Sequence, residues 1–210
     1  GTQDVSYISD KLTVIDGELA LDERALGSVE HLLFSKYLMY RNVYWHTTTR
    51  SATAMIKKAV LCALADGNLT SDQLYSLDDE QFFLLPFKAN DGYSKLFTQV
   101  RNNQLYHCSY EEAFDKQAVQ SLEERLSFES VLADRLGLAP HEVIIDIPEP
   151  ISFESEIPII SEDGRRHSFA ELDQIFSHDI SRVFTKSLRK FRIFTPHSVT
   201  REQIKAALEY

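Results

Sequence analysis

The chain has 210 residues and a formal net charge of −10, from 32 acidic and 22 basic side chains. This balance argues against a surface built mainly to hold a nucleic-acid backbone, because neutralising phosphates requires clustered lysines and arginines. Hydrophobic residues make up 43% and charged residues 26% of the chain, with seven glycines and six prolines. Such a composition is that of a folded globular protein and excludes a disordered or fibrous one.

Cysteine usage and apolar patterning indicate where the protein resides. Cys62 and Cys108 lie far apart in the sequence, and two free thiols in a chain of this size fit a reducing compartment. We therefore expect no disulfide and a cytoplasmic location. No run of 18 apolar residues and no signal-peptide pattern is present, so we expect no contact with a membrane. Because Gly1 leads almost directly into a strand-like pattern, we expect the chain to be a fragment cut from a longer one.

The first third of the chain predicts a β-hairpin followed by long helices. Residues 5–21 alternate as short β segments around Asp16–Gly17, a dipeptide typical of two-residue hairpin turns. From residue 22 to residue 65 apolar side chains recur at helical spacing without a proline, which predicts one or two long helices. We expect a break within residues 44–49, where three consecutive threonines offer a helix cap.

Short helices are expected in the middle of the chain. Gly67 should end the preceding helix, since glycine tolerates the left-handed conformation found after a helix. Residues 71–100 should form short helices, with acidic residues 78–80 placed favourably in a first turn. Residues 109–136 predict a further helix that ends at Gly137.

The last part of the chain shows the residue patterns of β-strands. Strands are expected at residues 143–147, 157–160 and 190–194, and Thr200 should cap a final helix over residues 201–208. The sequence thus predicts an α+β fold that is predominantly α, with an N-terminal β-hairpin, long helices and a smaller C-terminal α+β lobe.

The change from helical to strand-like sequence patterns also suggests two domains. Residues 1–136 would form a mainly helical part, and residues 137–210 would form the small α+β lobe. No flexible linker separates them.

One helical face combines a cation with apolar and aromatic side chains. Residues at spacings of three or four fall within a stripe about 80° wide on a helix. The stripe consists of Val29, Leu33, Lys36, Tyr40 and Tyr44. A lysine in its middle must reach solvent, pair with a carboxylate, or face a cavity that receives an anion, and the first two are the usual outcomes.

The residues next to this lysine suit a nucleotide. Tyr40, Arg41, Tyr44, Trp45 and His46 bring aromatic rings, a guanidinium and an imidazole within two helical turns. Such a mixture can stack a base and hold phosphate oxygens. Aromatic stripes at this spacing more often belong to a hydrophobic core, so both interpretations stay open at this point.

The segment Ser35-Lys36-Tyr37-Leu38-Met39-Tyr40-Arg41-Asn42-Val43-Tyr44-Trp45-His46 and the residues up to Ile56 resemble a known family. They are similar to the region downstream of the metal-binding motif in HD-superfamily dNTP triphosphohydrolases. This family includes bacterial phosphohydrolases and the vertebrate SAM-and-HD-domain enzyme. The resemblance implies that Lys36 is a triphosphate ligand and that Tyr44 closes on the sugar.

This sequence departs from the family pattern at three of these positions. Family members more often carry arginine at the position of Lys36. Lysine keeps the positive charge but cannot make the bidentate phosphate contact of arginine. His46 matches a family histidine, while Trp45 replaces a smaller polar residue. Thr47 replaces a lysine of the vertebrate enzyme's allosteric nucleotide site, so allosteric nucleotide binding is not carried over.

The metal ligands of the family are not recognised in this sequence. In the family, a His, a His-Asp pair and a distant Asp bind a divalent cation. The one His-Asp dipeptide here is His178–Asp179, which has the wrong position, with His167 as the nearest upstream histidine. We therefore expect no metal ligand in this chain and a divalent metal held by another segment of the intact parent.

No other sequence motif indicates a nucleotide-binding or hydrolytic site. A basic cluster could bind an anion or a nucleic acid. Strand alternation over residues 190–194, however, favours an ordinary solvent-exposed face. The cluster consists of Arg182, Lys186, Arg189, Lys190 and Arg192.

We expect the intact parent to cleave a nucleoside triphosphate into nucleoside and triphosphate. In this chain Lys36 would bind phosphate and Tyr44 the sugar, with Arg41, His46 and Tyr40 as further pocket residues. The chain alone should be inactive. The resemblance also implies a homo-oligomer. The alternative, from a different class, is a non-catalytic oligomerisation or protein-interaction module, in which the stripe is an assembly face and Lys36 pairs with a partner's carboxylate.

Overall fold

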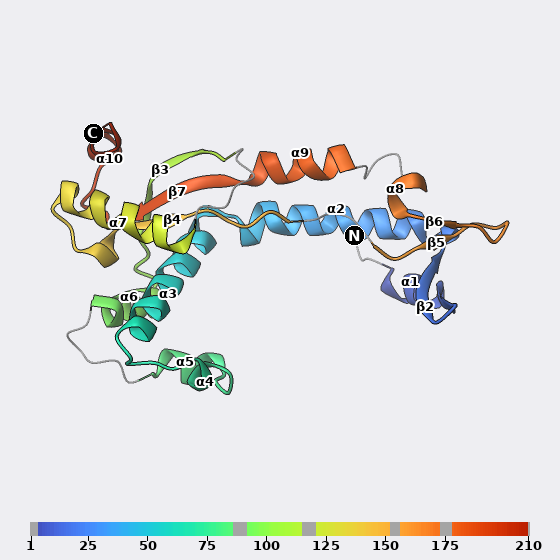
Figure 1. Ribbon diagram of the computed structural model, residues 1–210, viewed down its shortest axis with the longest axis horizontal. Coiled ribbons are helices and arrows are strands. Elements are labelled where there is room, and N and C mark those ends of the chain that lie inside the picture. Colours follow the sequence, from blue (N-terminus) through green and yellow to red (C-terminus); the bar gives the residue numbers. More distant parts are fainter. Residues whose placement is uncertain (1–3, 86–91, 115–120, 152–155, 173–177, 210) are drawn as a thin grey trace. The chain divides into compact units, whose positions relative to one another are not determined.

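A computed structural model describes residues 4–85, 92–114, 121–151, 156–172 and 178–209. The chain forms two compact units, each built from two separated stretches (Figure 1). Unit 1 consists of residues 1–45 and 149–189, and unit 2 of residues 46–148 and 190–210. The division into domains 1–136 and 137–210, which rests on the change in sequence texture, stays a prediction.

Unit 1 opens with a short helix and a β-hairpin. Its elements are α1 (Val5–Asp10), β1 (Leu12–Ile15), β2 (Glu18–Asp22), the 3-10 helix η1 (Glu23–Ala25), α2 (Leu26–Met39), the π-helix η2 (Tyr40–Tyr44), β5 (Ile159–Ile160), β6 (Arg166–His167), α8 (Phe169–Leu172) and α9 (His178–Leu188). The expected strand from residue 5 is wrong, because Asp4 caps α1 by accepting a hydrogen bond from the Tyr7 N–H at 2.9 Å. The hairpin is confirmed. Asp16 (φ 54°) and Gly17 (φ 82°) both adopt the left-handed conformation that its two-residue turn requires.

A small sheet and helix α2 share the core of unit 1. The strand order is β1-β2-β5-β6, in which β2 and β5 run parallel and the other neighbours antiparallel. Farther along α2, the ring of Tyr37 stacks on that of Phe184 from α9, with centroids 4.1 Å apart. The buried cluster consists of Leu21, Ala25, Val29, Leu33, Ile159 and Phe169.

The long helical stretch is interrupted where the sequence predicts a break. Helix α2 passes into the π-helix η2, and two residues separate η2 from a new helix, α3 (Thr47–Ala65). The cap differs from the expectation. The N-cap is His46, whose Nδ1 accepts a hydrogen bond from the Thr48 N–H at 3.4 Å. The three threonines instead form the first turn of α3.

Unit 2 packs helices around a three-stranded antiparallel sheet. Its elements are α3, α4 (Ser71–Leu74), α5 (Asp79–Phe83), α6 (Gly92–Arg101), β3 (His107–Ala113), α7 (Leu122–Leu136), the 3-10 helix η3 (Pro140–Glu142), β4 (Ile144–Asp146), β7 (Lys190–Thr195) and α10 (Arg201–Leu208). The strand order is β3-β7-β4, so β7 is the central strand. One buried cluster lies between α3 and α6, and another between the sheet and helices α7 and α10.

Helix ends in unit 2 follow the signals in the sequence. Gly67 and Gly137 adopt φ values of 68° and 66° after α3 and α7. Asp79 and Glu80 lie in the first turn of α5 as predicted, although Asp78 is its N-cap, and Thr200 caps α10 over the predicted residues. These predictions are confirmed because each rests on a hydrogen bond or a backbone conformation formed within a few residues.

The helix predicted over residues 109–136 is wrong in its first part. Residues 107–113 form β3, which pairs with β7, and α7 begins only at Leu122, where Ser121 provides the cap. The intervening residues 115–120 lie outside the described residues. Pairing with a strand about 80 residues away along the chain overrides the local pattern here.

The basic residues of β7 are not a simple solvent-exposed face. Arg192 is only 5% exposed, and its Nε donates to Oε2 of Glu111 at 2.6 Å on the neighbouring strand β3. The expectation of a solvated charged face is therefore wrong for Arg192, since a cross-strand carboxylate allows the guanidinium to be buried. Arg189 is also buried, whereas Arg182 and Lys186 on α9 are exposed.

Both units combine helices with small sheets, which confirms the predominantly helical α+β class. Within the described residues, no helix has the length and apolar character needed to cross a bilayer.

Candidate functional site

The residues predicted to contact a nucleotide follow one another along α2, η2 and the start of α3. Lys36 lies in the last turn of α2. The π-helix η2 contains Tyr40, Arg41 and Tyr44. These four residues belong to unit 1, whereas His46, which caps α3, belongs to unit 2.

The π-helix η2 holds the two predicted tyrosines next to each other. The Trp45 N–H donates to the carbonyl oxygen of Tyr40 at 2.8 Å, a bond that spans five residues instead of four. Such turns insert an extra residue into a helix and occur frequently at functional sites. Although the wider turn shifts Tyr44 from its α-helical position, its ring stays 5.1 Å from that of Tyr40. The aromatic end of the stripe is thus preserved.

Trp45 anchors this turn. Its indole is 5% exposed and meets the ring of Tyr40 edge-on, with centroids 5.6 Å apart. An edge-to-face pair of this kind contributes about 0.5–1.5 kcal/mol beyond the burial of its area. From the sequence, Trp45 counts among the rings that could stack a base and as a departure from the family pattern; nothing local shows that the π-helix buries it.

Accessibility increases along the stripe from its beginning to its end. Val29 and Leu33 are buried in the core of unit 1, Lys36 and Tyr40 are half-buried, and Tyr44 is 50% exposed. Arg41 and His46 are also exposed. The end of the stripe that carries the predicted sugar and phosphate contacts can therefore be reached by a ligand.

Helix α2 also exposes large apolar side chains away from this stripe. At 100° per residue, Phe34 and Leu38 point to the side opposite Lys36, and both are exposed. Leu32 and Met39, which flank the stripe, are exposed as well. Large apolar side chains exposed on two sides of one helix make α2 a candidate contact surface.

Helix α3, in contrast, is fixed to the sheet of unit 2 by two charged pairs. Arg50 binds the carboxylate of Asp146 through two nitrogens, with Nε 2.8 Å from Oδ2. Lys58 pairs with Glu129 of α7, and the second oxygen of Glu129 accepts a hydrogen bond from the Ile145 N–H at 2.7 Å. All four charged side chains are largely buried, so α3 is a firmly positioned element.

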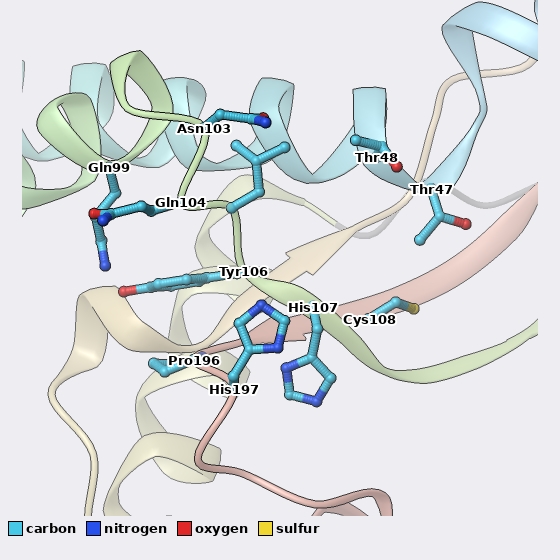
Figure 2. Close-up of a pocket in the computed structure, with 11 residues that line it drawn as sticks. Thr47, Thr48, Gln99, Asn103, Gln104, Tyr106, His107, Cys108, Pro196 and His197 are labelled. Atoms are coloured by element: carbon cyan, nitrogen blue, oxygen red, sulfur yellow. The ribbon is translucent and has the colours of Figure 1, made fainter.

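A cavity of about 740 Å³ lies in unit 2 beside the start of α3 (Figure 2). Four segments line it: the first turn of α3, the end of α6 with the loop after it, the beginning of β3, and the loop after β7. The size is within the range of small-molecule sites. The sequence offered no motif for this cavity, since its walls come from distant parts of the chain.

Two histidines form one side of the cavity. The rings of His107 and His197 are nearly parallel, at 16°, with centroids 4.9 Å apart. The Nδ1 of His107 donates to the carbonyl oxygen of Thr195 at 3.1 Å, because a carbonyl oxygen can only accept. That bond directs the His107 ring, and its Nε2 is left as an acceptor in the neutral form.

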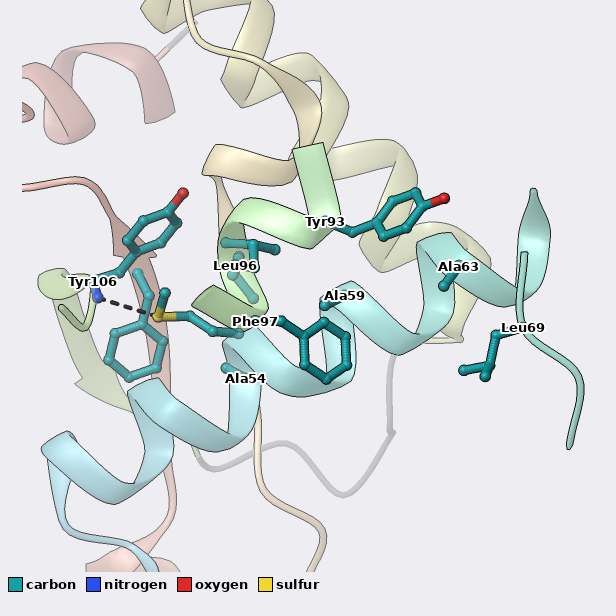
Figure 3. Close-up of a cluster of buried hydrophobic side chains, with 11 residues drawn as sticks. Ala54, Ala59, Ala63, Leu69, Tyr93, Leu96, Phe97 and Tyr106 are labelled. Atoms are coloured by element: carbon teal, nitrogen blue, oxygen red, sulfur yellow. Dashed lines mark hydrogen bonds between the residues drawn. The ribbon is translucent and has the colours of Figure 1, made fainter. Parts of the chain in front are cut away.

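Tyr106 forms the wall next to the core of unit 2. Its N–H donates to Sδ of Met55 at 3.2 Å, and its carbonyl oxygen accepts from the Ser51 hydroxyl at 2.6 Å. Figure 3 shows this contact beside the residues of α6 that pack on α3. The small side chains Ala54 and Ala59 on α3 allow α6 to approach closely, which fixes the wall of the cavity.

The described residues contain no group of three or more His, Cys, Asp or Glu that could hold a metal ion. His178 and Asp179 open α9, but their side chains lie outside the described part of the chain. The divalent metal expected in the intact parent stays a prediction.

Comparison with known proteins identifies the family. The sequence profile of the family described as "HD associated region" matches residues 4–210. An uncharacterised protein of Methanocaldococcus jannaschii is 30% identical over 160 residues, which cover 70% of this chain and 33% of that protein. The match therefore spans about a third of that relative's length.

Two solved structures share the fold. One is a phosphohydrolase from Bacteroides thetaiotaomicron, with a TM-score of 0.62 and 19% identity over 94% of this chain and 56% of that one. The other is a hypothetical protein from Aquifex aeolicus, with a TM-score of 0.64 and 18% identity over 99% of this chain and 52% of that one. This chain spans little more than half of each. Since the family profile matches nearly every residue, the chain belongs to the family of HD-associated regions.

Proposed function

We propose that this chain is the substrate-contacting part of an HD-superfamily phosphohydrolase that cleaves a nucleoside triphosphate into nucleoside and triphosphate. In that reaction water attacks the α-phosphorus, the bond from this phosphorus to O5′ breaks, and O5′ takes up a proton as the nucleoside hydroxyl. Membership of the HD-associated family supports the proposal, as does the fold that the chain shares with a phosphohydrolase.

One observation carries the proposal: a half-buried lysine precedes an accessible tyrosine on one helical stripe. Lys36 lies between the buried start of the stripe and the half-exposed Tyr44. An ammonium group partly removed from water attracts a phosphate more strongly than a fully solvated one. The ring of Tyr44 offers a flat surface to a sugar, supported by Tyr40 at 5.1 Å.

The remaining predicted residues take supporting roles in this proposal. Lys36 binds the triphosphate and Tyr44 packs on the sugar, while Arg41, His46 and Tyr40 make further contacts. A divalent metal, when bound, polarises a phosphate or activates water. The described residues supply no ligand set for it, so we assign its binding to another part of the intact protein and derive no metal step from this chain.

The test is hydrolysis of nucleoside triphosphates by the full-length protein with a divalent metal, followed by chromatography of nucleoside and triphosphate. Lys36→Ala should lower kcat/KM roughly 10- to 100-fold, the worth of a hydrogen bond to a charged group. Lys36→Arg should keep most of the activity because the charge remains. Tyr44→Ala should lower kcat/KM as well, and the 210-residue chain alone should be inactive.

Matched controls come from exposed residues of the same types. Lys57 and Tyr75 are exposed and belong to unit 2. Lys57→Ala and Tyr75→Ala should leave kcat/KM within about twofold of the unsubstituted protein, as is usual for surface changes. Equal activity of Lys36→Ala and Lys57→Ala would refute the role of Lys36 and with it the proposed use of the stripe.

A second candidate function is assembly, and the exposed apolar residues of α2 favour it. Phe34 and Leu38 face away from Lys36, so a partner could cover them without blocking the stripe. We propose that this side contacts a second copy or another part of the intact protein. Leu38→Glu should then reduce the mass measured by light scattering of the full-length protein, whereas an unchanged oligomer would exclude contact between copies through this side.

A further inference from the structure

The cavity of unit 2 differs in charge from the rest of the chain. The chain carries 32 acidic and 22 basic residues among 210. Among the described residues that line the cavity, however, none is Asp, Glu, Lys or Arg. Burial raises the pKa of Cys108, also part of the lining, to about 11, so its thiol is uncharged at neutral pH. A charged ligand would find no carboxylate, ammonium or guanidinium partner among these lining residues.

The polar groups of the lining are instead neutral donors and acceptors. Gln99, Asn103 and Gln104 each offer a carboxamide, which can donate and accept at the same time. Thr47 and Thr48 add hydroxyl groups. Carboxamides pair well with the donor and acceptor edge of a nucleobase, as they do in base recognition generally.

Two buried atoms at this cavity have no hydrogen-bond partner among the residues that the structure describes. They are the hydroxyl oxygen of Tyr106, a residue only 4% exposed, and Oε1 of Gln99. Figure 2 shows the Tyr106 hydroxyl directed toward the ends of the Gln99 and Gln104 side chains. Buried polar groups without a partner cost about 1–3 kcal/mol each, so such groups call for an explanation. Because both atoms are buried, a ligand that bonds to them has to displace the side chain of Gln99.

Aromatic surface is available next to these groups. The parallel rings of His107 and His197 form a flat platform on one side of the cavity. Desolvation raises the pKa of the Tyr106 phenol, with Glu142 adding to the effect, so this hydroxyl stays protonated and can donate. A planar heterocycle with a hydrogen-bonding edge matches both features.

We propose that this cavity binds an uncharged nucleoside, in preference to the corresponding triphosphate. This inference rests on the proposed function, because hydrolysis of a nucleoside triphosphate at that site would release such a nucleoside as product. The base would lie against the histidine pair, with its edge on the carboxamides and the Tyr106 hydroxyl. The cavity would then be a product-binding site separate from the stripe that carries Lys36.

The test is a titration of the 210-residue chain with the four 2′-deoxynucleosides and their triphosphates at pH 8, followed by NMR of the histidine ring protons. At least one nucleoside should shift the His107 and His197 signals, assigned through His107→Gln and His197→Gln. The corresponding triphosphate should bind at these residues at least about tenfold more weakly, since none of the described lining residues is a lysine or arginine. The local signals separate this cavity from any binding at Lys36.

Tyr106→Phe distinguishes a ligand role from a structural one. It should weaken nucleoside binding about three- to tenfold, the worth of one hydrogen bond, and leave the thermal unfolding midpoint unchanged or higher. Tyr75→Phe, at a tyrosine that is 89% exposed, should change neither quantity.

The inference is overturned if no nucleoside shifts these signals at millimolar concentration. It is also overturned if the triphosphate binds more tightly than the nucleoside, or if Tyr106→Phe binds normally. None of these readouts requires catalysis. A negative hydrolysis assay would therefore refute the proposed function, whereas a negative titration would refute the nucleoside site, so the two failures can be told apart.

Discussion

The buried pair Lys58–Glu129 allows a direct test of what holds α3 in unit 2. Glu129 is 3% exposed, one of its oxygens pairs with Lys58, and the other accepts from the Ile145 N–H at 2.7 Å. Glu129→Ala would leave a buried ammonium group and a buried N–H without partners. Breaking a buried pair costs about 3–5 kcal/mol, and the orphaned N–H adds ~1–3 kcal/mol. We expect a total loss of about 4–8 kcal/mol, comparable to the whole stability of a small domain.

Two further variants separate these contributions. In Lys58→Met with Glu129→Leu both charges are removed, so only the Ile145 N–H stays without a partner, and we expect at least half of the lost stability to return. Glu123→Ala changes an exposed carboxylate in the first turn of the same helix and should cost less than about 1 kcal/mol.

The assay is urea unfolding followed by circular dichroism, with the free energy extrapolated to water. The reasoning is refuted if Glu129→Ala unfolds at the same urea concentration as Glu123→Ala. A double variant that is no more stable than Glu129→Ala would equally show that the buried charge is not the cause.

Two predictions concern His141, whose ring occupies the space that a side chain at position 92 would need. In Gly92→Ala the new Cβ would lie 2.2 Å from Cε1 of the His141 ring, so the free energy of unfolding should fall by about 1–3 kcal/mol and recover when His141→Ala is added. An unchanged urea midpoint for Gly92→Ala would contradict this. Burial also lowers the pKa of His141 below its ordinary value of 6.5. The unfolded chain therefore binds this proton more readily, and stability present above pH 6.5 is lost as the pH falls below it. The difference between the thermal unfolding midpoints at pH 5.5 and pH 7.5 should be smaller for His141→Gln than for the unsubstituted protein. An equal difference in the two proteins would exclude His141 as the cause.

Features that depend on neighbouring residues could be predicted from the sequence. The hairpin turn at Asp16–Gly17 and the helix end at Gly67 require left-handed backbone that these residue types adopt readily. The cap at Thr200 requires only a hydroxyl three residues before a backbone N–H. The Asp4 cap was equally local, but the alternating pattern that follows it favoured a strand.

Features that depend on distant residues could not be predicted in the same way. Strand β3 exists because it pairs with β7, and Arg192 is buried because that pairing brings Glu111 to it. The cavity beside Tyr106 is formed by four separate segments, which no local pattern connects. The stripe from Val29 to Tyr44 could be predicted as a face, whereas the π-helix that ends it depends on the burial of Trp45.

The two long helices have different physical roles. Helix α3 is tied into unit 2 through the buried charges of Arg50 and Lys58, so its position is determined within the unit. Helix α2, which carries Lys36, leaves Phe34 and Leu38 exposed on its other side. Covering these side chains would stabilise α2 by about 25 cal/mol for each Å² of apolar area removed from water. The same contact would restrict the motion of Lys36 and Tyr44, so under our proposal the substrate contacts would gain their final geometry only when α2 is covered, and the isolated chain should therefore bind a nucleoside triphosphate more weakly than the intact protein does.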